Sequence, residues 1–313
     1  TQPDVRKTKW IEGDKDAKES NTENTIAPAG TFNMYVNREP RFYVSVLYNG
    51  AWYRQSSRYV DFYYEGEDGR PASGSLWDAP QTGYLLRKRV HPETNILNYS
   101  IPYRPGIICR LAEAYLNYAE AKAELGTLTQ DDLDISVNLL RDRAGMEDAH
   151  IDMDEANANP DPYLMADVTG YPNVTKSAMT GVILEIRRER TVELCLEGFR
   201  LFDMIRWKEG KQLTNEYHGV YFPGEGKYDL NGDGKKETAI YKDQAPSGLG
   251  LTKYKLGVDF FLTNDTEGYM WPHKDVKRIW NEERDYLWPI PTDERTLNHS
   301  LTQNPGWEDG LSY

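Results

Sequence analysis

Two segments of this sequence have apolar residues three to four positions apart, a spacing that is typical of helices packed against each other. The first covers residues 105–126, where Pro105 suits a first helical turn and Gly126 suits a C-terminal exit. We expect one stripe of this helix to be buried, comprising Ile108, Leu111, Tyr115 and Tyr118. Three alanines on the same helix would let a neighbouring helix approach closely, namely Ala112, Ala119 and Ala123. The segment therefore predicts a helix packed against others.

The helical segments form two pairs. A helix predicted at 131–145 follows the first after a short connection, which predicts an antiparallel αα-hairpin. A second pair is predicted over 177–208, with a break near Glu197–Gly198. Such hairpins resemble tetratricopeptide units, but a self-standing solenoid needs about three of them. Either the irregular regions complete the core, or more repeats precede residue 1.

The rest of the chain favours strands and irregular structure. Alternating Phe42, Val44, Val46 and Tyr48 predict a strand that ends at a hairpin turn at Asn49–Gly50. The prolines at 289 and 291 exclude helix where they stand. The fold class is therefore mainly α, with extensive irregular and short-strand regions.

Three regions are expected along the chain. Residues 1–104 form a polar arm and a loop-rich, ligand-side region, residues 105–208 form the two helix hairpins, and residues 209–313 form a loop-rich C-terminal region. We expect them to form one compact unit.

Charge and hydropathy exclude several classes of partner. The chain has 37 Lys and Arg against 50 Asp and Glu, a formal net charge of −13. Nucleic acid and anionic membrane surfaces require a basic footprint, so neither is expected as the main partner. No apolar run approaches the roughly 20 residues of a membrane-spanning helix. Two cysteines, Cys109 and Cys195, do not make a disulfide scaffold.

Charge is densest in residues 187–207, "RRERTVELCLEGFRLFDMIRW". Acidic and basic residues alternate at a spacing of three, in the series Glu197, Arg200, Asp203 and Arg206. We interpret the segment as an ion-pair network that joins two helices, with a docking surface as the alternative. On the second of these helices Phe199, Phe202 and Ile205 are expected to face the core.

The sequence "DLNGDGKKE" has the spacing of a calcium-binding loop. Oxygen donors at positions 1, 3, 5 and 9 would be Asp229, Asn231, Asp233 and Glu237, and the Lys235 carbonyl would fill position 7. Position 12 is Ile240 rather than the glutamate of an EF-hand. We predict a structural Ca²⁺ site, with a metal-free Asp/Asn/Gly turn as the alternative.

Aromatic residues in the irregular region are the candidate ligand-binding residues. They are Trp52, Tyr53, Trp77 and Tyr84, with Tyr269 and Trp271 as weaker candidates. Flat aromatic rings stack on the apolar C–H faces of sugars, while the alternative is that these rings pack in the core. No nucleophile-elbow, Walker A or dinucleotide motif is present, so an enzyme is not expected.

Five blocks of the sequence, in order, resemble the C-terminal part of the SusD/RagB family. They are "RLAEAYLNYAEAKAELG", "LLRDRAGM", "ILEIRRERTVELCLEGFRLFDMIRW", "YLWPIPTDE" and "LTQNPGW". The segment "TGYLLRKRV" adds to the likeness, whereas Met204 and His299 depart from the residues usual in the family. The resemblance implies that the chain lacks the N-terminal half of a family member, including its further helices.

The resemblance also implies a function. Family members are outer-membrane lipoproteins of Bacteroidetes-type bacteria, exposed at the cell surface and anchored through an N-terminal cysteine that is not in this chain. They capture oligosaccharides, or in some members peptides, and deliver them to a SusC-like TonB-dependent transporter. The expected partners are thus that transporter, the ligand and the N-terminal half of the same protein. An alternative of another class is a tetratricopeptide-type scaffold for protein interactions.

Overall fold

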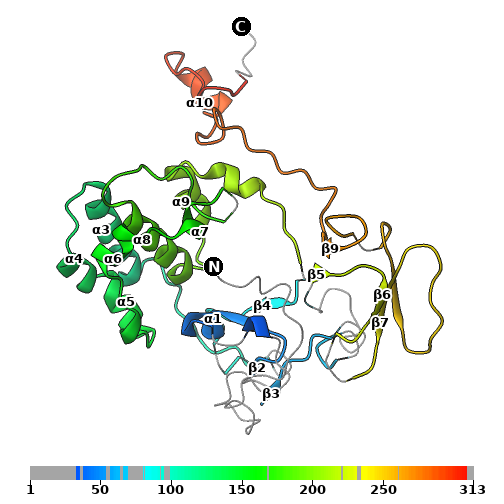
Figure 1. Cartoon of the computed structure of the whole chain (residues 1–313). Helices are drawn as coiled ribbons and strands as arrows, with labels where there is room; N and C mark the ends of the chain where they lie inside the picture. Colours follow the sequence, from blue (N-terminus) through cyan, green and yellow to red (C-terminus); the bar gives the residue numbers. More distant parts are fainter. Residues whose placement is uncertain are drawn as a thin grey trace. The chain divides into compact units, whose positions relative to one another are not determined.

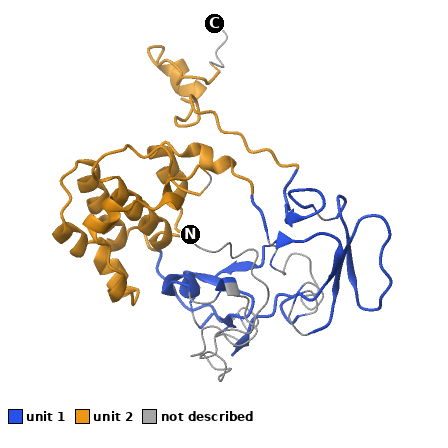
Figure 2. Cartoon of the chain, viewed as in Figure 1, with its two compact units in different colours: residues 1–106, 217–274 blue, residues 107–216, 275–313 orange. Residues whose placement is uncertain are grey.

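The structure is a computed structural model. It describes residues 33–35, 38–53, 57–63, 66–69, 80, 82–91, 93–94, 99–167, 169–219, 221–230, 234–259 and 261–308. The chain divides into two compact units, each made of two separate segments (Figure 2). Unit 1 comprises Thr1–Gly106 and Tyr217–Lys274, and unit 2 comprises Ile107–Glu216 and Asp275–Tyr313.

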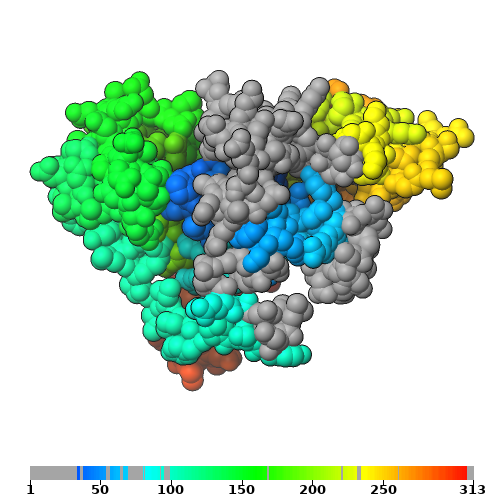
Figure 3. Space-filling view, turned by 90° about the horizontal axis from the view of Figure 1, so that it is seen from below, coloured from blue at the N-terminus to red at the C-terminus, as the bar shows by residue number. Residues whose placement is uncertain are grey.

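Unit 2 is helical (Figure 1). Its elements are α3 (Leu111–Glu124), α4 (Gln130–Asp134), α5 (Val137–Arg143), η5 (Glu147–Ala149), α6 (Met153–Ala158), α7 (Pro162–Met165), α8 (Thr180–Glu193), α9 (Arg200–Arg206), η6 (Gly210–Thr214) and α10 (Thr292–Leu297). Helix α8 lies against α3 and α6, and one hydrophobic core joins these helices. In space-filling form the green helices of this unit make a continuous packed surface on the face in view (Figure 3).

Helix α3 differs from its prediction in its start and in its buried face. It begins at Leu111 rather than Pro105, and Ile108 is 99 % exposed. Leu111 and Tyr118 are also exposed, so the predicted stripe is wrong except at Tyr115, which is half-buried against the core. The buried residues are Ala112, Leu116, Ala119, Glu120 and Ala123. Helix α8 packs closely on α3, and the three alanines are buried there together with Leu116.

The two remaining predicted helical segments, 131–145 and 177–208, are each divided into two helices. The segment predicted as one helix at 131–145 is α4 followed by α5, and α4 begins with a capping box between Thr129 and Asp132. The break expected near Glu197–Gly198 is confirmed, since α8 ends at Glu193 and α9 begins at Arg200. The backbone turns there through positive φ angles at Leu196 and Gly198, 64° and 89°.

Unit 1 is built from short elements. They are η3 (Asn33–Tyr35), α1 (Pro40–Ser45), β1 (Val46–Tyr48), β2 (Trp52–Tyr53), β3 (Arg58–Tyr59), β4 (Tyr84–Leu86), β5 (Tyr221–Phe222), β6 (Gly226–Tyr228), β7 (Thr238–Tyr241), β8 (Thr252–Lys255) and β9 (Gly268–Tyr269). Strands β1–β4, β2–β3 and β5–β9 pair antiparallel, and β6–β7–β8 form a three-stranded sheet in which β7 and β8 are parallel. Two small cores, one around Tyr48 and one around Ile240, support them.

The strand predicted from Phe42 to Tyr48 is wrong in its first half. Residues 40–45 form helix α1, which Pro40 begins, and only Val46–Tyr48 is strand. A turn does form at Asn49–Gly50, where Gly50 has a φ of 85°, but β1 pairs with β4 and β2 with β3. The turn therefore joins two sheets rather than closing a hairpin.

The predicted fold class is confirmed: the chain is helix-rich, with short strands and long irregular stretches. Among the described residues, no helix has both the length and the apolar character needed to cross a membrane.

Candidate functional site

The first candidate surface is an aromatic pair on strands β2 and β3. Trp52 and Tyr59 are directly opposite each other, with ring centroids 5.1 Å apart in an edge-to-face arrangement. Both are half-buried, so part of each ring remains exposed. Tyr59 was not among the predicted site residues, although its place after a turn and in a short strand makes it the cross-strand partner of Trp52.

The next residue, Tyr53, has different surroundings. Successive strand residues point to opposite faces, and Tyr53 packs against the core cluster around Tyr48. The Arg58 guanidinium lies 5.9 Å from the Tyr53 ring centroid. Tyr53 therefore borders the core, whereas Trp52 and Tyr59 lie on the other face of the two strands.

Strand β3 is held by a two-pronged ion pair. The Arg58 guanidinium donates to both oxygens of Asp68 at 2.6 Å, and Asp68 also accepts from the Asp61 amide at 2.9 Å. Burial acts to raise the pKa of Asp68, but these hydrogen bonds outweigh it and lower that pKa below its ordinary value. The carboxylate thus stays charged and fixes the strand that carries Tyr59.

The other predicted aromatic residues lie elsewhere. Tyr84 is on β4, exposed, with its ring edge-to-face with Tyr35 at 6.0 Å. Trp77 lies outside the described residues. Tyr269 contacts Tyr221 edge-to-face, and Trp271 contacts His218 in the same way. The structure therefore brings Trp52 together with Tyr59, while Tyr84 belongs to a separate sheet.

The predicted calcium loop lies between β6 and β7, and a hydrogen bond links two of its described residues. Asp229 accepts a hydrogen bond from the Gly234 amide at 2.8 Å, and Gly234 has a φ of 87°. Lys235 is exposed beyond the turn, and Asn231 and Asp233 lie outside the described residues. Within the part of the chain that is described, no three metal-ligating side chains come together.

One carboxylate of this loop has a free oxygen. Glu237 uses Oε1 to accept from the Leu230 amide at 2.6 Å, while its buried Oε2 has no hydrogen-bond partner among the described residues. The pKa of the nearby Tyr63 is raised, by burial first and then by the carboxylates of Asp61, Glu237 and Asp229. Several carboxylates are therefore close together here.

The charged stretch 187–207 forms the predicted ion-pair network. Arg190 on α8 donates to both oxygens of the buried Asp203 on α9 at 2.8 Å, and Asp203 also pairs with Arg206 at 3.0 Å. The buried Glu193 accepts from Arg110 at 2.5 Å and from Arg143 at 2.7 Å. These contacts confirm that the charges connect helices within unit 2.

Three details of that prediction are wrong. Arg200 donates to Tyr171 and Thr191, not to a neighbouring carboxylate, and Glu197 instead pairs with Arg110. Phe202 is 61 % exposed rather than facing the core. The reason is that the buried face of α9 carries Asp203 and Met204, which meet Arg190 and the core. Pairing across helices has displaced an aromatic residue to the surface.

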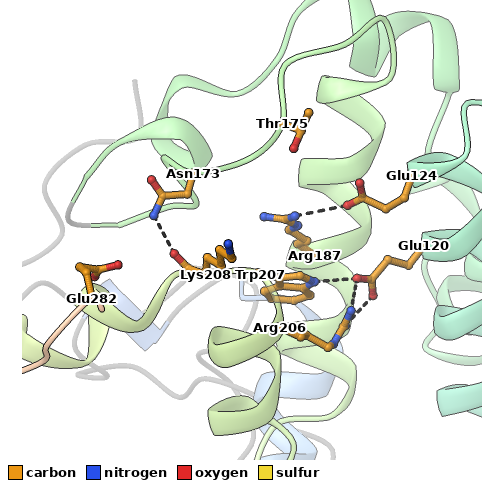
Figure 4. A pocket seen from close by; sticks show the side chains of 9 residues that line it. All are labelled: Glu120, Glu124, Asn173, Thr175, Arg187, Arg206, Trp207, Lys208 and Glu282. Atoms are coloured by element: carbon orange, nitrogen blue, oxygen red, sulfur yellow. Dashed lines mark hydrogen bonds and ion pairs between the residues drawn. The ribbon is translucent and has the colours of Figure 1, made fainter. Parts of the chain in front are cut away.

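A pocket of about 660 Å³ lies in unit 2 at the end of this network (Figure 4). Its lining residues are Glu120, Glu124, Asn173, Thr175, Arg187, Arg206, Trp207, Lys208 and Glu282. The Trp207 ring lies between Arg187 and Arg206, each guanidinium 4.8 Å from the ring centroid. Trp207 and Arg206 both donate to Glu120, which holds this side of the pocket.

Arg187 has fewer hydrogen-bond partners than Arg190 on the same helix. Among the described residues its side chain makes one hydrogen bond, from Nη2 to Glu124 at 3.3 Å, and its Nε and Nη1 have none. The sequence indicated this shortage of partners, because no acidic residue lies three or four positions from Arg187 on its helix. The sequence prediction treated it as one of several paired arginines and missed the pocket.

Helix hairpins together with a loop-rich unit define a tetratricopeptide-like fold class, and the sequence comparison gives its family. The profile described as the SusD family matches residues 4–307, so the chain belongs to the SusD family. No curated protein matches the chain.

Two solved structures from Bacteroides fragilis NCTC 9343 are similar. One, a SusD-like protein, is 25 % identical with a TM-score of 0.48, covering 88 % of this chain and 40 % of its own. The other is named a SusD-like carbohydrate binding protein; it is 23 % identical with a TM-score of 0.49, covering 86 % and 42 %. This chain therefore spans about two fifths of the length of these proteins.

Proposed function

We propose that this chain is part of a glycan-binding protein of the SusD family and that it binds oligosaccharides through the Trp52–Tyr59 pair. The observation that carries the proposal is the half-exposed, edge-to-face geometry of these two rings in a chain of this family. An aromatic face offers a sugar ring an apolar contact area without a large loss of side-chain entropy.

We also propose that the whole protein acts at the cell surface. The whole protein would be a lipid-anchored outer-membrane component that passes its ligand to a SusC-like TonB-dependent transporter. The family membership supports this role, and the net charge of −13 suits a partner other than nucleic acid. Binding without turnover is expected, so the chain is proposed to be a carrier and not an enzyme.

The experiment is calorimetric titration of the chain with an array of oligosaccharides and, in parallel, of short peptides. We expect micromolar binding to at least one glycan, and a loss of about tenfold or more in affinity in Trp52→Ala and in Tyr59→Ala. Trp288→Ala is the matched control, because Trp288 is 69 % exposed and belongs to unit 2.

Three outcomes contradict parts of the proposal. Unchanged glycan affinity in both variants excludes the aromatic pair as the site. Binding of peptides but of no glycan indicates the peptide-capturing branch of the family. Release of reducing sugar from a bound polysaccharide indicates an enzyme.

We also propose that the 229–237 loop binds Ca²⁺ in a structural role. The support is the buried Oε2 of Glu237, which has no hydrogen-bond partner among the described residues, together with Asp229 at the first position of the same loop. Asn231, Asp233 and the Lys235 carbonyl would supply further oxygens, as the spacing predicts.

A further inference from the structure

The pocket beside Trp207 contains a buried cation with unmet hydrogen-bonding capacity. Arg187 is 4 % exposed, and its Nε and Nη1 have no hydrogen-bond partner. A buried donor left without an acceptor is destabilising, and more so when it is charged. Arg190, on the same helix, shows the contrast: its guanidinium bonds to both oxygens of Asp203 and to Asn117. Arg187 thus has two N–H groups available for a further acceptor, besides its ion pairs with Glu124 and Glu209.

The acidic residues around Arg187 leave its charge incompletely offset. Glu124 is a partly exposed partner at 3.3 Å, and the nearest oxygen of Glu209 is 3.8 Å from Nη1. Burial lowers the pKa of Arg187 below its ordinary value in spite of the carboxylates of Glu124, Glu120 and Glu209. An additional oxygen anion at the guanidinium would therefore be favoured.

Further donors line the same space. Figure 4 shows Arg187 and Thr175 on one side of the pocket and Asn173 and Lys208 on another. Lys208 is exposed, and no ion pair to its ammonium group is found among the described residues. The pocket therefore presents two cationic groups to a ligand, one buried and one at the rim.

The charge and the shape of the pocket restrict the ligand. The lining has three basic side chains and three acidic ones, Glu120, Glu124 and Glu282, so a dianion such as phosphate would meet repulsion. A monoanionic carboxylate matches the guanidinium in charge and geometry. The Trp207 ring is covered by Arg187 and Arg206, so it cannot serve as a platform for a neutral sugar. A volume of about 660 Å³ accommodates one small organic acid.

We propose that this pocket is a binding site for a small carboxylate of the size of a uronic acid, with Arg187 holding the carboxylate and Lys208 assisting at the rim. This site belongs to unit 2 and is distinct from the aromatic pair on β2 and β3. The test of this site is therefore independent of the test of the function proposed above.

The test is titration of the 313-residue chain with D-galacturonate, with D-galactose as the neutral analogue and acetate as the bare carboxylate. We expect galacturonate to bind and galactose not to. Arg187→Gln should abolish the binding, and Lys208→Gln should weaken it about fivefold. Lys211→Gln, an exposed lysine on η6 that does not line the pocket, should leave the affinity unchanged.

If Arg187→Gln does not fold, the affinity of Lys208→Gln for galacturonate tests the proposal instead, because the Lys208 side chain is exposed. Acetate binding as tightly as galacturonate would retain the carboxylate site but remove the sugar ring from it. Equal binding of galactose, unchanged affinity in Lys208→Gln, or loss of galacturonate binding in Trp52→Ala would each overturn the proposal.

Discussion

At the scale of single residues, the buried carboxylate of Glu209 in unit 2 has a shifted pKa. Glu209 is 1 % exposed; its Oε1 accepts from the Asn173 amide at 2.9 Å and its Oε2 has no hydrogen-bond partner. Burial raises its pKa to about 7, and nearby Glu282 adds to this, while the Asn173 amide, Arg187 and Arg200 act in the opposite direction. Glu209 therefore changes charge near neutral pH.

This shift predicts a pH-dependent stability. The folded chain binds more protons at Glu209 than the unfolded chain between about pH 4.5, the ordinary value, and pH 7. Its contribution is therefore complete below pH 4.5 and is lost as the pH rises through 7. The slope reaches at most about 1.4 kcal/mol per pH unit in this window.

Urea unfolding at pH 5, 6, 7 and 8 measures this effect. We expect Glu209→Gln to become more stable relative to the wild type as the pH rises from 5 to 8, because the amide avoids a buried negative charge. Glu225→Gln, at an exposed glutamate, should follow the wild-type profile. Identical pH profiles for Glu209→Gln and the wild type would contradict the assignment.

Sequence reasoning at the scale of residues was correct where pairing is local and failed where partners come from other helices. The spacing of Asp203 and Arg206 predicted their contact, which is present at 3.0 Å. The same rule paired Arg200 with its neighbours, whereas Arg200 contacts Tyr171 and Thr191. Spacing along one helix cannot show which distant side chain will be closer.

At the scale of elements, the amount of helix was predictable but the buried face of each helix was not. Helix α3 was predicted from its apolar spacing, yet Leu111 and Tyr118 of the predicted stripe are exposed, and the buried face carries the three alanines with Leu116. A stripe calculation favours the largest apolar side chains, whereas close helix packing favours the smallest. The small-residue positions were the better guide to the contact.

The loop between β6 and β7 carries a prediction at this scale. We expect a chelator to lower the melting temperature and Ca²⁺ to restore it, because a ligand bound only by the folded state stabilises that state. Asp229→Asn should reduce the calcium-dependent shift. Magnesium serves as the control, since its smaller ion demands stricter octahedral geometry. A melting temperature that does not respond to calcium would leave the loop as a metal-free turn.

At the scale of the whole molecule, each unit is assembled from segments that are far apart in the sequence. The C-terminal part of unit 2 reaches the helices through Trp280 and Tyr286, and the Tyr286 hydroxyl accepts from the Gly210 amide at 3.2 Å. A Cβ at Gly210 would overlap the indole of Trp280. Glycine at this position therefore permits the C-terminal segment to pack and places Glu282 at the pocket.

Gly210→Ala should therefore weaken this packing by about 1–3 kcal/mol, the usual cost of overfilling a packed site. We expect faster proteolysis within residues 275–308 of the variant, measured by limited digestion and mass spectrometry. Gly126→Ala is a control for the added methyl group alone, since a Cβ there meets no atom within 4 Å, although its φ of 69° adds local strain. Equal digestion of Gly210→Ala and wild type would exclude the role of Gly210.

By itself the sequence determined the family, the helix-rich class, the break between α8 and α9, and the ion-paired character of residues 187–207. These follow from local periodicity, from glycine at a positive φ, and from ordered blocks of residues. The tertiary structure decided which face of α3 is buried, that Tyr59 is the partner of Trp52, and that Arg187 is left with unpaired donors above Trp207. Burial and pairing depend on side chains brought together from distant segments, and the spacing of residues along the chain does not contain that information.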